Sequence, residues 1–245
     1  MLQRDVAEGI HRVEEAFTNW YLVEDGESVT VVDAGYPSGW HTLPKVLAAL
    51  GRAPSDVQAL VVTHAHPDHI GFAELLRTEW DVPVWLHERD RSISRHPFRY
   101  ETERPVFRYL SPRLLKFAVA MAREGVLGTQ PLGDVRAFAD EDELDAPGRP
   151  VPVLTPGHTH GHTAFHFPDR GAVIVGDALS TAEPYTGKPG PRLLAGASNA
   201  DSTQALASLQ RIADTAADVL LVGHGAPWTQ GAQLAVDRAR EAGPS

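Results

Sequence analysis

Cysteine is absent from the 245-residue chain. This absence excludes disulfides, iron–sulfur clusters, thiolate nucleophiles and cysteine-type zinc sites, so any metal must be bound by histidine and carboxylate side chains. Long apolar runs are also missing, since none approaches the roughly 18 residues that a membrane helix needs. Residues 1–15 lack the apolar segment that marks a secretory signal. We therefore expect a cytoplasmic protein with no membrane partner.

Positive charge is scarce. The chain has 22 Lys and Arg against 32 Asp and Glu, a formal net charge of −10 at pH 7. Proteins that bind duplex nucleic acid are usually basic, so we expect no nucleic-acid partner. A hydrophobic share of 42% and a charged share of 22% are ordinary for a globular protein and exclude extensive disorder. We predict a single domain over residues 1–245, within the range that this length allows.

Strand-like and helix-like segments alternate along the chain, which is typical of a layered α/β fold. Short apolar or β-branched runs predict strands at residues 17–23, 28–32, 59–62, 83–86, 151–154, 162–167, 172–175 and 218–222. Amphipathic spacing between capping residues predicts helices at residues 39–50, 70–78, 202–214 and 230–241.

Residues 88–125 differ from the rest of the chain in charge. They carry nine Arg and Lys residues against five Asp and Glu, so this stretch is net +4. Ser111 and Pro112 predict a helix start, apolar residues follow at helical spacing (Leu114, Phe117 and Met121), and Gly125 predicts the end. We expect a helical insertion that packs on the main domain. Its apolar stripe is more typical of a core than of a substrate wall, although a lid over a site is an alternative.

The strongest chemical signal is the segment His64-Ala65-His66-Pro67-Asp68-His69. Residues two apart in an extended segment point the same way, so His64 and His66 can share one metal ion. The turn at Pro67 then directs Asp68 and His69 toward a second ion nearby. A polar loop of solvated histidines is the simpler alternative, but four ligand-type residues in six positions, directly after an apolar strand, favour metal binding.

Three more ligand-type residues follow predicted strands. His158 comes after the strand at 151–154, Asp177 after 172–175 and His224 after 218–222. Layered α/β folds build their sites at strand ends of this kind. Each feature alone is weak, because Gly-Asp and Gly-His pairs are common in turns. Together they predict one site assembled from several loops.

The set of Asp33, the His64–His69 segment, His158, Asp177 and His224 resembles the metallo-β-lactamase fold superfamily, in the order of that family. The resemblance implies an αββα four-layer sandwich with a dinuclear site at one edge. It implies that His64, His66 and His158 bind the first ion, that Asp68, His69 and His224 bind the second, and that Asp177 bridges both. Asp33 and His162 would lie in the outer shell. An Asx turn is an equally good local interpretation of Asp33.

The absence of cysteine and the Asp68-His69 pair are similar to the hydrolase branches of the family, and residues 155–162 resemble the hydroxyacylglutathione hydrolase and lactonase branches. This resemblance implies a metal-dependent hydrolase with two zinc ions, or iron or manganese in their place. A bridging hydroxide would attack an ester, thioester or lactone carbonyl, with Asp68 and Asp177 as the catalytic residues. The alternative is a mononuclear iron oxygenase of the same fold that resembles persulfide dioxygenases.

The substrate is expected to be a small molecule. The positive metal centre and the basic 88–125 segment suggest an anionic one, although that segment can equally be a solvated helix face. Tyr185 is the only tyrosine near Asp177 that could match the substrate-contacting tyrosine of the lactonase branch. His160 stands where that branch usually has proline, and an exposed loop position is the simplest interpretation.

Overall fold

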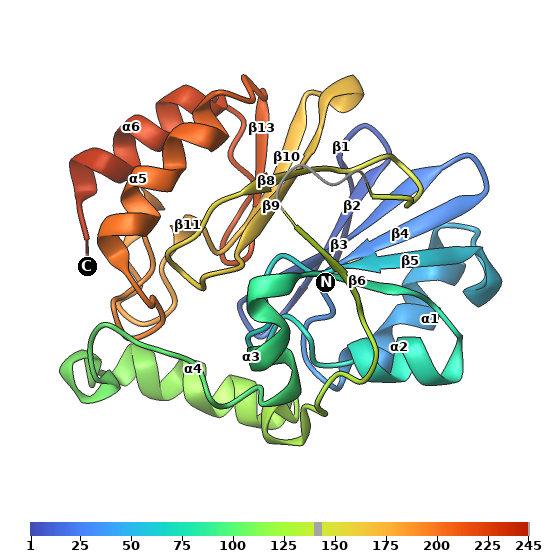
Figure 1. Cartoon of the computed structure of the whole chain (residues 1–245), viewed down its shortest axis with the longest axis horizontal. Coiled ribbons are helices and arrows are strands. Elements are labelled where there is room, and N and C mark those ends of the chain that lie inside the picture. The colour runs from blue at the N-terminus through green and yellow to red at the C-terminus, as the bar shows by residue number, and fades with distance from the viewer. Residues whose placement is uncertain (140–143, 245) are drawn as a thin grey trace.

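The structure is a computed structural model that describes residues 1–139 and 144–244. Two main β-sheets pack face to face, and helices cover the outer face of each (Figure 1). The layers run helix, sheet, sheet, helix, which confirms the αββα sandwich expected from the sequence. Within the described residues, no helix combines the length and the apolar character needed to cross a bilayer.

The first sheet has seven strands in sequence order, antiparallel from β1 to β4 and parallel from β4 to β7. Its strands are β1 (Leu2–Ala7), β2 (Ile10–Glu15), β3 (Thr18–Asp25), β4 (Ser28–Val32), β5 (Val57–Val61), β6 (Val84–His87) and β7 (Arg136–Phe138). The strands β1, β2 and β7 are not among those predicted from the sequence, and they extend both edges of the predicted sheet.

The second sheet has the order β13-β10-β9-β8, with β10 and β13 parallel and the other pairs antiparallel. Its strands are β8 (Val151–Leu154), β9 (Thr163–Phe167), β10 (Ala172–Gly176) and β13 (Val219–Val222). A separate hairpin consists of β11 (Ser180–Ala182) and β12 (Pro189–Arg192).

Alternate residues of the central strands serve two different cores. In β3, Trp20 and Leu22 face the helices, whereas Tyr21 and Val23 lie between the sheets. In β10, Val173 and Val175 face the helices on the other side, while Ile174 lies between the sheets. Because both faces are buried, these strands are continuous apolar runs, which is why they were predictable.

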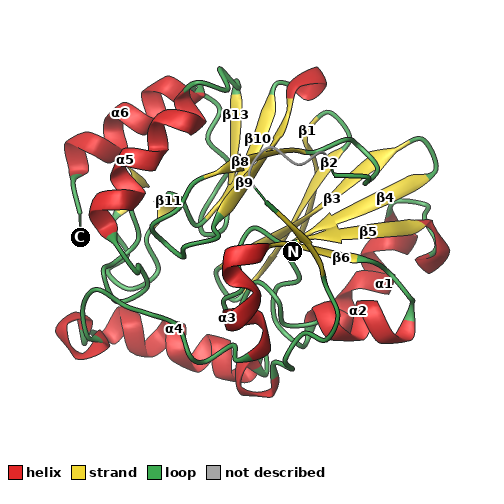
Figure 2. Ribbon diagram, viewed as in Figure 1, coloured by secondary structure: helices red, strands yellow, loops and turns green. Residues whose placement is uncertain are grey.

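Helices α1 and α2 cover the first sheet, and α5 and α6 cover the second (Figure 2). Their bounds are α1 (Gly39–Ala49), α2 (Ala73–Glu79), α5 (Ser202–Ala213) and α6 (Ala232–Ala242), with short 3-10 turns η1 (Pro54–Asp56) and η5 (Pro168–Arg170). The helix predicted from residue 70 begins at Ala73 instead. Gly71 and Phe72 donate their backbone N–H groups to the carbonyls of Gly35 and Ala34, so these two groups are bonded outside the helix.

The insertion is a series of short helices rather than one element. It comprises η2 (Glu88–Asp90), α3 (Arg91–Arg95), η3 (Val106–Tyr109), α4 (Pro112–Arg123) and η4 (Val126–Gly128). The predicted ends of α4 are confirmed, because the Ser111 hydroxyl accepts from Leu114 N–H and Gly125 has a φ of 80°. The helix lies across the open end of the sandwich (Figure 1). Backbone bonds from Glu103 to Asn199 and from Ser38 to Glu124 tie the insertion to both halves.

Candidate metal centre

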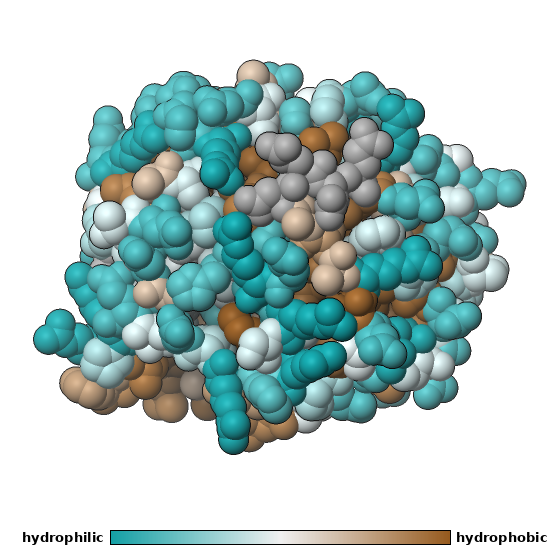
Figure 3. Space-filling model, in the orientation of Figure 1, coloured by the Kyte–Doolittle hydropathy of each residue, from teal (hydrophilic) through white to brown (hydrophobic). Residues whose placement is uncertain are grey.

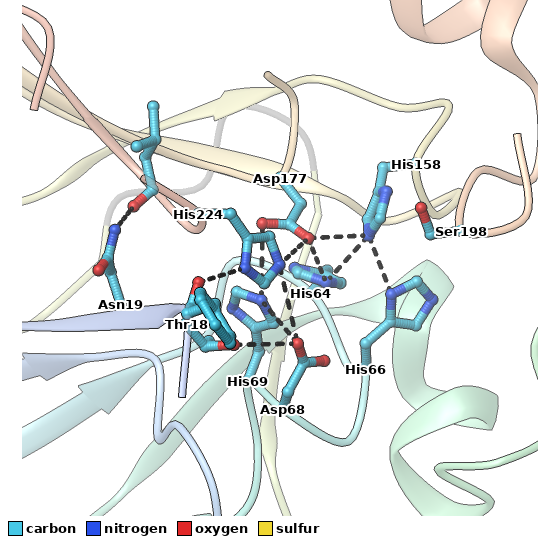
Figure 4. A network of polar contacts seen from close by, with 12 residues as sticks. Thr18, Asn19, His64, His66, Asp68, His69, His158, Asp177, Ser198 and His224 are labelled. Atoms are coloured by element: carbon cyan, nitrogen blue, oxygen red, sulfur yellow. Dashed lines mark hydrogen bonds and ion pairs between the residues drawn. The ribbon is translucent and has the colours of Figure 1, made fainter. Parts of the chain in front are cut away.

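The sequence-predicted ligand residues lie on loops that follow strand ends. The loop after β5 carries His64, His66, Asp68 and His69, and the loops after β8, β10 and β13 carry the others. The four loops meet at one edge of the two sheets, so that the seven side chains converge (Figure 4).

Three histidines form the first group. The Nε2 atom of His158 lies 3.2 Å from Nε2 of His64 and 2.9 Å from Nδ1 of His66. All three side chains are buried. The three nitrogen atoms lie within 4.8 Å of one another, which suits three ligands of a single ion.

The second group consists of Asp68, His69 and His224. The Asp68 Oδ2 atom lies 3.9 Å from His69 Nε2 and 3.7 Å from His224 Nε2. Asp177 stands between the two groups. Its Oδ2 atom is 3.1 Å from His224 Nε2 and 3.5 Å from His158 Nε2, and its Oδ1 atom is 3.6 Å from His69 Nε2.

In four of these histidines, the ring nitrogen that points away from the centre lies at hydrogen-bond distance from an acceptor. His69 Nδ1 is 2.9 Å from Asp33 Oδ2, and His224 Nδ1 is 2.8 Å from the Phe17 carbonyl. His158 Nδ1 is 2.9 Å from Asn199 Oδ1, whose amide group donates elsewhere. Similarly, His64 Nδ1 lies 3.0 Å from Thr63 Oγ1, and this hydroxyl donates its own hydrogen to Asp33 Oδ2.

This arrangement places the proton of each imidazole on Nδ1. The Nε2 lone pairs of His64, His69, His158 and His224 are therefore directed inward, toward one another and toward the carboxylates. Buried lone pairs that face each other repel unless a cation lies between them. His69 Nε2 and Asp177 Oδ1 are buried and have no hydrogen-bond partner in the described part of the chain. The donor set therefore fits divalent metal ions.

Without a cation, protons bound to the histidines partly offset this repulsion. Burial lowers the pKa of His69, but the charges of Asp177, Asp68 and Asp33 outweigh burial and raise it to about 10. Burial raises the pKa of Asp177, but His224 and His69 outweigh that effect and hold it well below its usual value. Burial and the neighbouring histidines hold the pKa values of His64 and His66 well below the usual one, so both are neutral ligands near pH 7.

Asp33 and His162 surround the ligands without belonging to either group. Asp33 has a φ of 60°, and its carboxylate accepts from Thr63 N–H and from His69 rather than closing an Asx turn. His162 Nδ1 lies 2.8 Å from Thr155 Oγ1, and its Nε2 accepts from the Asp177 backbone N–H. Burial and His158 lower the pKa of His162 to about 3, which keeps it a neutral acceptor.

Two buried residues of the site have no clear sequence signal. Asp90 accepts from Ala65 N–H, Thr159 Oγ1 and Gly161 N–H, and so joins the loops of the two halves. In the sequence it is only one of the acids in the basic segment. Asn199, which orients His158, follows no motif. His160, by contrast, is 53% exposed at its side chain and pairs with Glu101, as expected for a loop histidine.

A cavity of about 230 Å³ opens above the centre. Tyr185 lines it, as do Asp68, Asp177 and His224. Phe117 and Met121 line it as well, so the apolar stripe of α4 forms part of the cavity wall. The prediction that this stripe belongs to a core is wrong for these two residues, because α4 lies over the open end of the sandwich rather than against a sheet.

Comparisons with known proteins agree with this fold. The probable metallo-hydrolase YflN of Bacillus subtilis is 25% identical over 242 residues, which cover 92% of this chain and 87% of that protein. The metallo-beta-lactamase family protein TTHA1429 of Thermus thermophilus has a TM-score of 0.68 at 26% identity, covering 96% of this chain and 79% of the other. A di-iron-bound form of TTHA1623 has a TM-score of 0.60 at 26% identity, covering 89% and 93%.

The family model that describes the metallo-beta-lactamase superfamily matches residues 13–224. The match spans all seven residues at the centre and confirms the superfamily resemblance seen in the sequence. The finer resemblance to hydroxyacylglutathione hydrolases and lactonases stays a prediction. The chain belongs to the metallo-beta-lactamase superfamily.

Proposed function

We propose that the chain is a hydrolase that uses two divalent metal ions to cleave an ester, thioester or lactone. The observation that carries this proposal is the position of Asp177 between two complete groups of three ligands. His64, His66 and His158 would hold the first ion, and Asp68, His69 and His224 the second. Asp177 would bridge both.

Two divalent ions at these positions would polarise a substrate carbonyl and supply a nucleophilic water near neutral pH. Asp68 is the residue best placed to move a proton to the leaving group, because its carboxylate lines the cavity. Thr18 Oγ1 donates to this carboxylate over 3.3 Å and lies 2.8 Å from the Tyr36 hydroxyl. These contacts orient Asp68 toward the cavity.

Zinc is the metal that we propose first, because ligand sets of imidazole and carboxylate suit it. The di-iron-bound relative makes iron the main competitor. A mononuclear iron oxygenase would need only the first group. The complete second group of Asp68, His69 and His224 therefore supports the hydrolase over that alternative.

The experiment is metal analysis of protein purified without chelator or added metal, followed by assays on esters, thioesters and lactones. We expect about two zinc ions per chain and hydrolysis of at least one class. One iron per chain, with oxygen consumption in the presence of thiol substrates, would overturn the proposal.

The variant Asp177→Ala tests the bridge. We expect it to lose bound metal and to reduce kcat/KM by more than the 10- to 100-fold that is typical of changes in a ligand's outer partners. Asp169→Ala, which removes an exposed carboxylate in η5, is the matched control and should keep both properties. Full activity in Asp177→Ala would rule out the dinuclear centre.

A further inference from the structure

The wall of the cavity beyond the metal centre is almost entirely apolar. Its apolar side chains come mostly from the insertion, with one from the loop after β5 and two from the second half: Pro67, Phe98, Phe117, Met121, Val126, Leu127, Pro184 and Leu194. The polar groups that remain outside the ligand set are Ser198 and the phenols of Tyr100 and Tyr185.

The basic residues of the insertion lie elsewhere. Within the described residues, no Arg or Lys lines the cavity, although residues 88–125 carry nine of them. Arg113 and Lys116 of α4, for example, lie over the Phe17 ring. A substrate carboxylate held in the cavity away from the metal centre would be desolvated without a cation to compensate it, which is costly.

The two phenols supply neutral donors. The Tyr100 ring packs against His66 at 4.2 Å between centroids, tilted by 45°, and the Tyr185 ring packs on Phe117 at 5.9 Å. Neither hydroxyl has a hydrogen-bond partner within residues 1–139 and 144–244. A phenolic hydroxyl carries its proton near pH 7, so both groups can act as hydrogen-bond donors. They can donate to an uncharged oxygen of a substrate.

The mouth of the cavity is apolar too. Phe98 and Leu127 line the cavity and are 52% and 81% exposed. More exposed hydrophobic residues of the insertion, including Val106 and Phe107, lie along η3 and the start of α4, where Figure 3 shows a hydrophobic area. An apolar chain longer than the cavity would leave it past Phe98 and Leu127.

We propose that the substrate is uncharged and carries an apolar group that occupies this cavity, while Tyr100 donates to a substrate oxygen. This inference rests on the proposed hydrolase and replaces the expectation of an anionic substrate, which came from the positive metal centre and the charge of the insertion together. The insertion determines substrate specificity through those of its side chains that line the cavity. Its basic side chains are not part of the substrate site.

The test compares metal-loaded protein on p-nitrophenyl esters of straight-chain acids from acetate upward, and on acetate esters of straight-chain alcohols. In one of the two series, kcat/KM should rise by up to about fourfold per added CH2 until the cavity is filled. An ester of the same length that ends in a carboxylate should be at least about tenfold poorer, because the charge is desolvated. Equal or better turnover of the carboxylate ester, or no rise in either series, would overturn the inference.

A charge introduced on α4 makes the test sharper. Met121→Lys places a cation in the wall and should abolish or reverse the preference for the uncharged ester. Leu115→Lys is the matched control, because Leu115 lies on the same helix, is 66% exposed and does not line the cavity. If Met121→Lys fails to fold, Leu127→Lys at the exposed mouth tests the same point. An unchanged preference in a folded variant would contradict the inference.

Tyr100→Phe tests the donor while keeping the ring on His66. We expect KM for the uncharged ester to rise about 2- to 10-fold, the loss of one hydrogen bond, with unchanged metal content. An unchanged KM would mean that the Tyr100 hydroxyl does not donate a hydrogen bond to the substrate.

A binding measurement separates this inference from the proposed function. Calorimetry with 1-butanol, 1-hexanol and 1-octanol should show affinity that rises with chain length and that falls in Met121→Lys. If no ester, thioester or lactone is hydrolysed but the alcohols bind in this way, the proposed function fails and the apolar cavity stands. If esters are hydrolysed with no dependence on chain length, the proposed function stands and the apolar substrate site is overturned.

Discussion

At the scale of single residues, the outer partners of the histidines decide which nitrogen faces the centre. Asp33 orients His69 in the second group, and Asn199 orients His158 in the first. Each imidazole would otherwise be free to turn or to change tautomer. The two proposed ions should therefore respond separately to changes at these two residues.

Asp33→Asn and Asn199→Ala test this separation. We expect Asn199→Ala to weaken the first ion by about 10- to 100-fold in affinity. Asp33→Asn should weaken the second ion by a similar factor and the first ion less, because Asp33 reaches His64 only through Thr63. Zinc titration of chelator-treated protein, monitored by calorimetry, measures the affinity of each of the two binding steps. If Asp33→Asn left the second step unchanged, or Asn199→Ala weakened only the second, the assignment of the candidate ligands to two groups would be wrong.

The charge around His69 gives the centre a pH dependence. Its pKa is raised to about 10, so in the metal-free protein His69 is protonated near pH 7 and a metal must displace that proton. Zinc affinity should therefore increase from pH 6 to pH 9, and binding should release protons. Calorimetry in buffers with different ionisation enthalpies counts those protons. A constant affinity and no proton release over this range would contradict the expectation.

The seven residues that converge at the candidate centre could be predicted from the sequence because they form a dense motif followed by isolated His and Asp residues after apolar strands. The residues that support them could not. Asp90 belongs to a run of charged residues, and only the folded chain brings it to Thr159 and Gly161. Tyr100 lies in a segment without periodicity, so nothing local indicated that its ring packs on His66.

At the scale of elements, apolar runs identified the central strands, and capping residues identified the ends of α4. The strands β1 and β2 were missed because they mix charged and apolar residues, as in Leu2–Ala7. The positive charge of the insertion was visible in the sequence, but the direction in which its side chains point was not. Which side chains face the cavity depends on how α4 crosses the open end of the sandwich.

The contact between the His158 loop and α5 depends on a glycine. A Cβ atom on Gly157 would lie 2.1 Å from the Ala205 backbone nitrogen, and its φ of 132° is unfavourable for other residues. Gly157→Ala should destabilise the fold by about 2–5 kcal/mol and displace His158. Denaturant unfolding and zinc titration measure the two effects.

Gly26→Ala is the control for the backbone conformation alone. Gly26 also has a positive φ, 59°, but nothing lies within 4 Å of the added Cβ. Strain of about 1–3 kcal/mol is expected there, with metal binding unaffected. If the two variants behaved alike, the close packing at Gly157 would have no part in holding His158.

At the scale of the whole molecule, the centre joins the two halves of the sandwich. The first half supplies His64, His66, Asp68 and His69, and the second supplies His158, Asp177 and His224. Other bonds cross the same boundary, including Tyr21 Oη to the Val222 carbonyl at 2.6 Å and Asn19 Nδ2 to the same carbonyl at 2.8 Å. Metal binding should therefore stabilise the fold as a unit.

Removal of the metal by a chelator should lower Tm. Ions that bind only the native state stabilise it by about 2.7 kcal/mol when the free metal is at 100 times Kd, and each kcal/mol shifts Tm by roughly 2–4 °C at this size. We expect a decrease of about 5–10 °C for each ion removed, which zinc should reverse. Asp177→Ala should show a much smaller decrease on chelation. A chelator-insensitive Tm in the unmodified chain would mean that the centre does not couple the halves.

The division of the ligands between the halves has a consequence for fragments of the chain. Each of the two proposed ions needs side chains from both sides of the boundary, so neither half alone could bind an ion with its full set. Two polypeptides produced by dividing the chain between β7 and β8 would each lack a working centre. Their reassembly would be linked to metal concentration, and regained hydrolysis would report complementation between them.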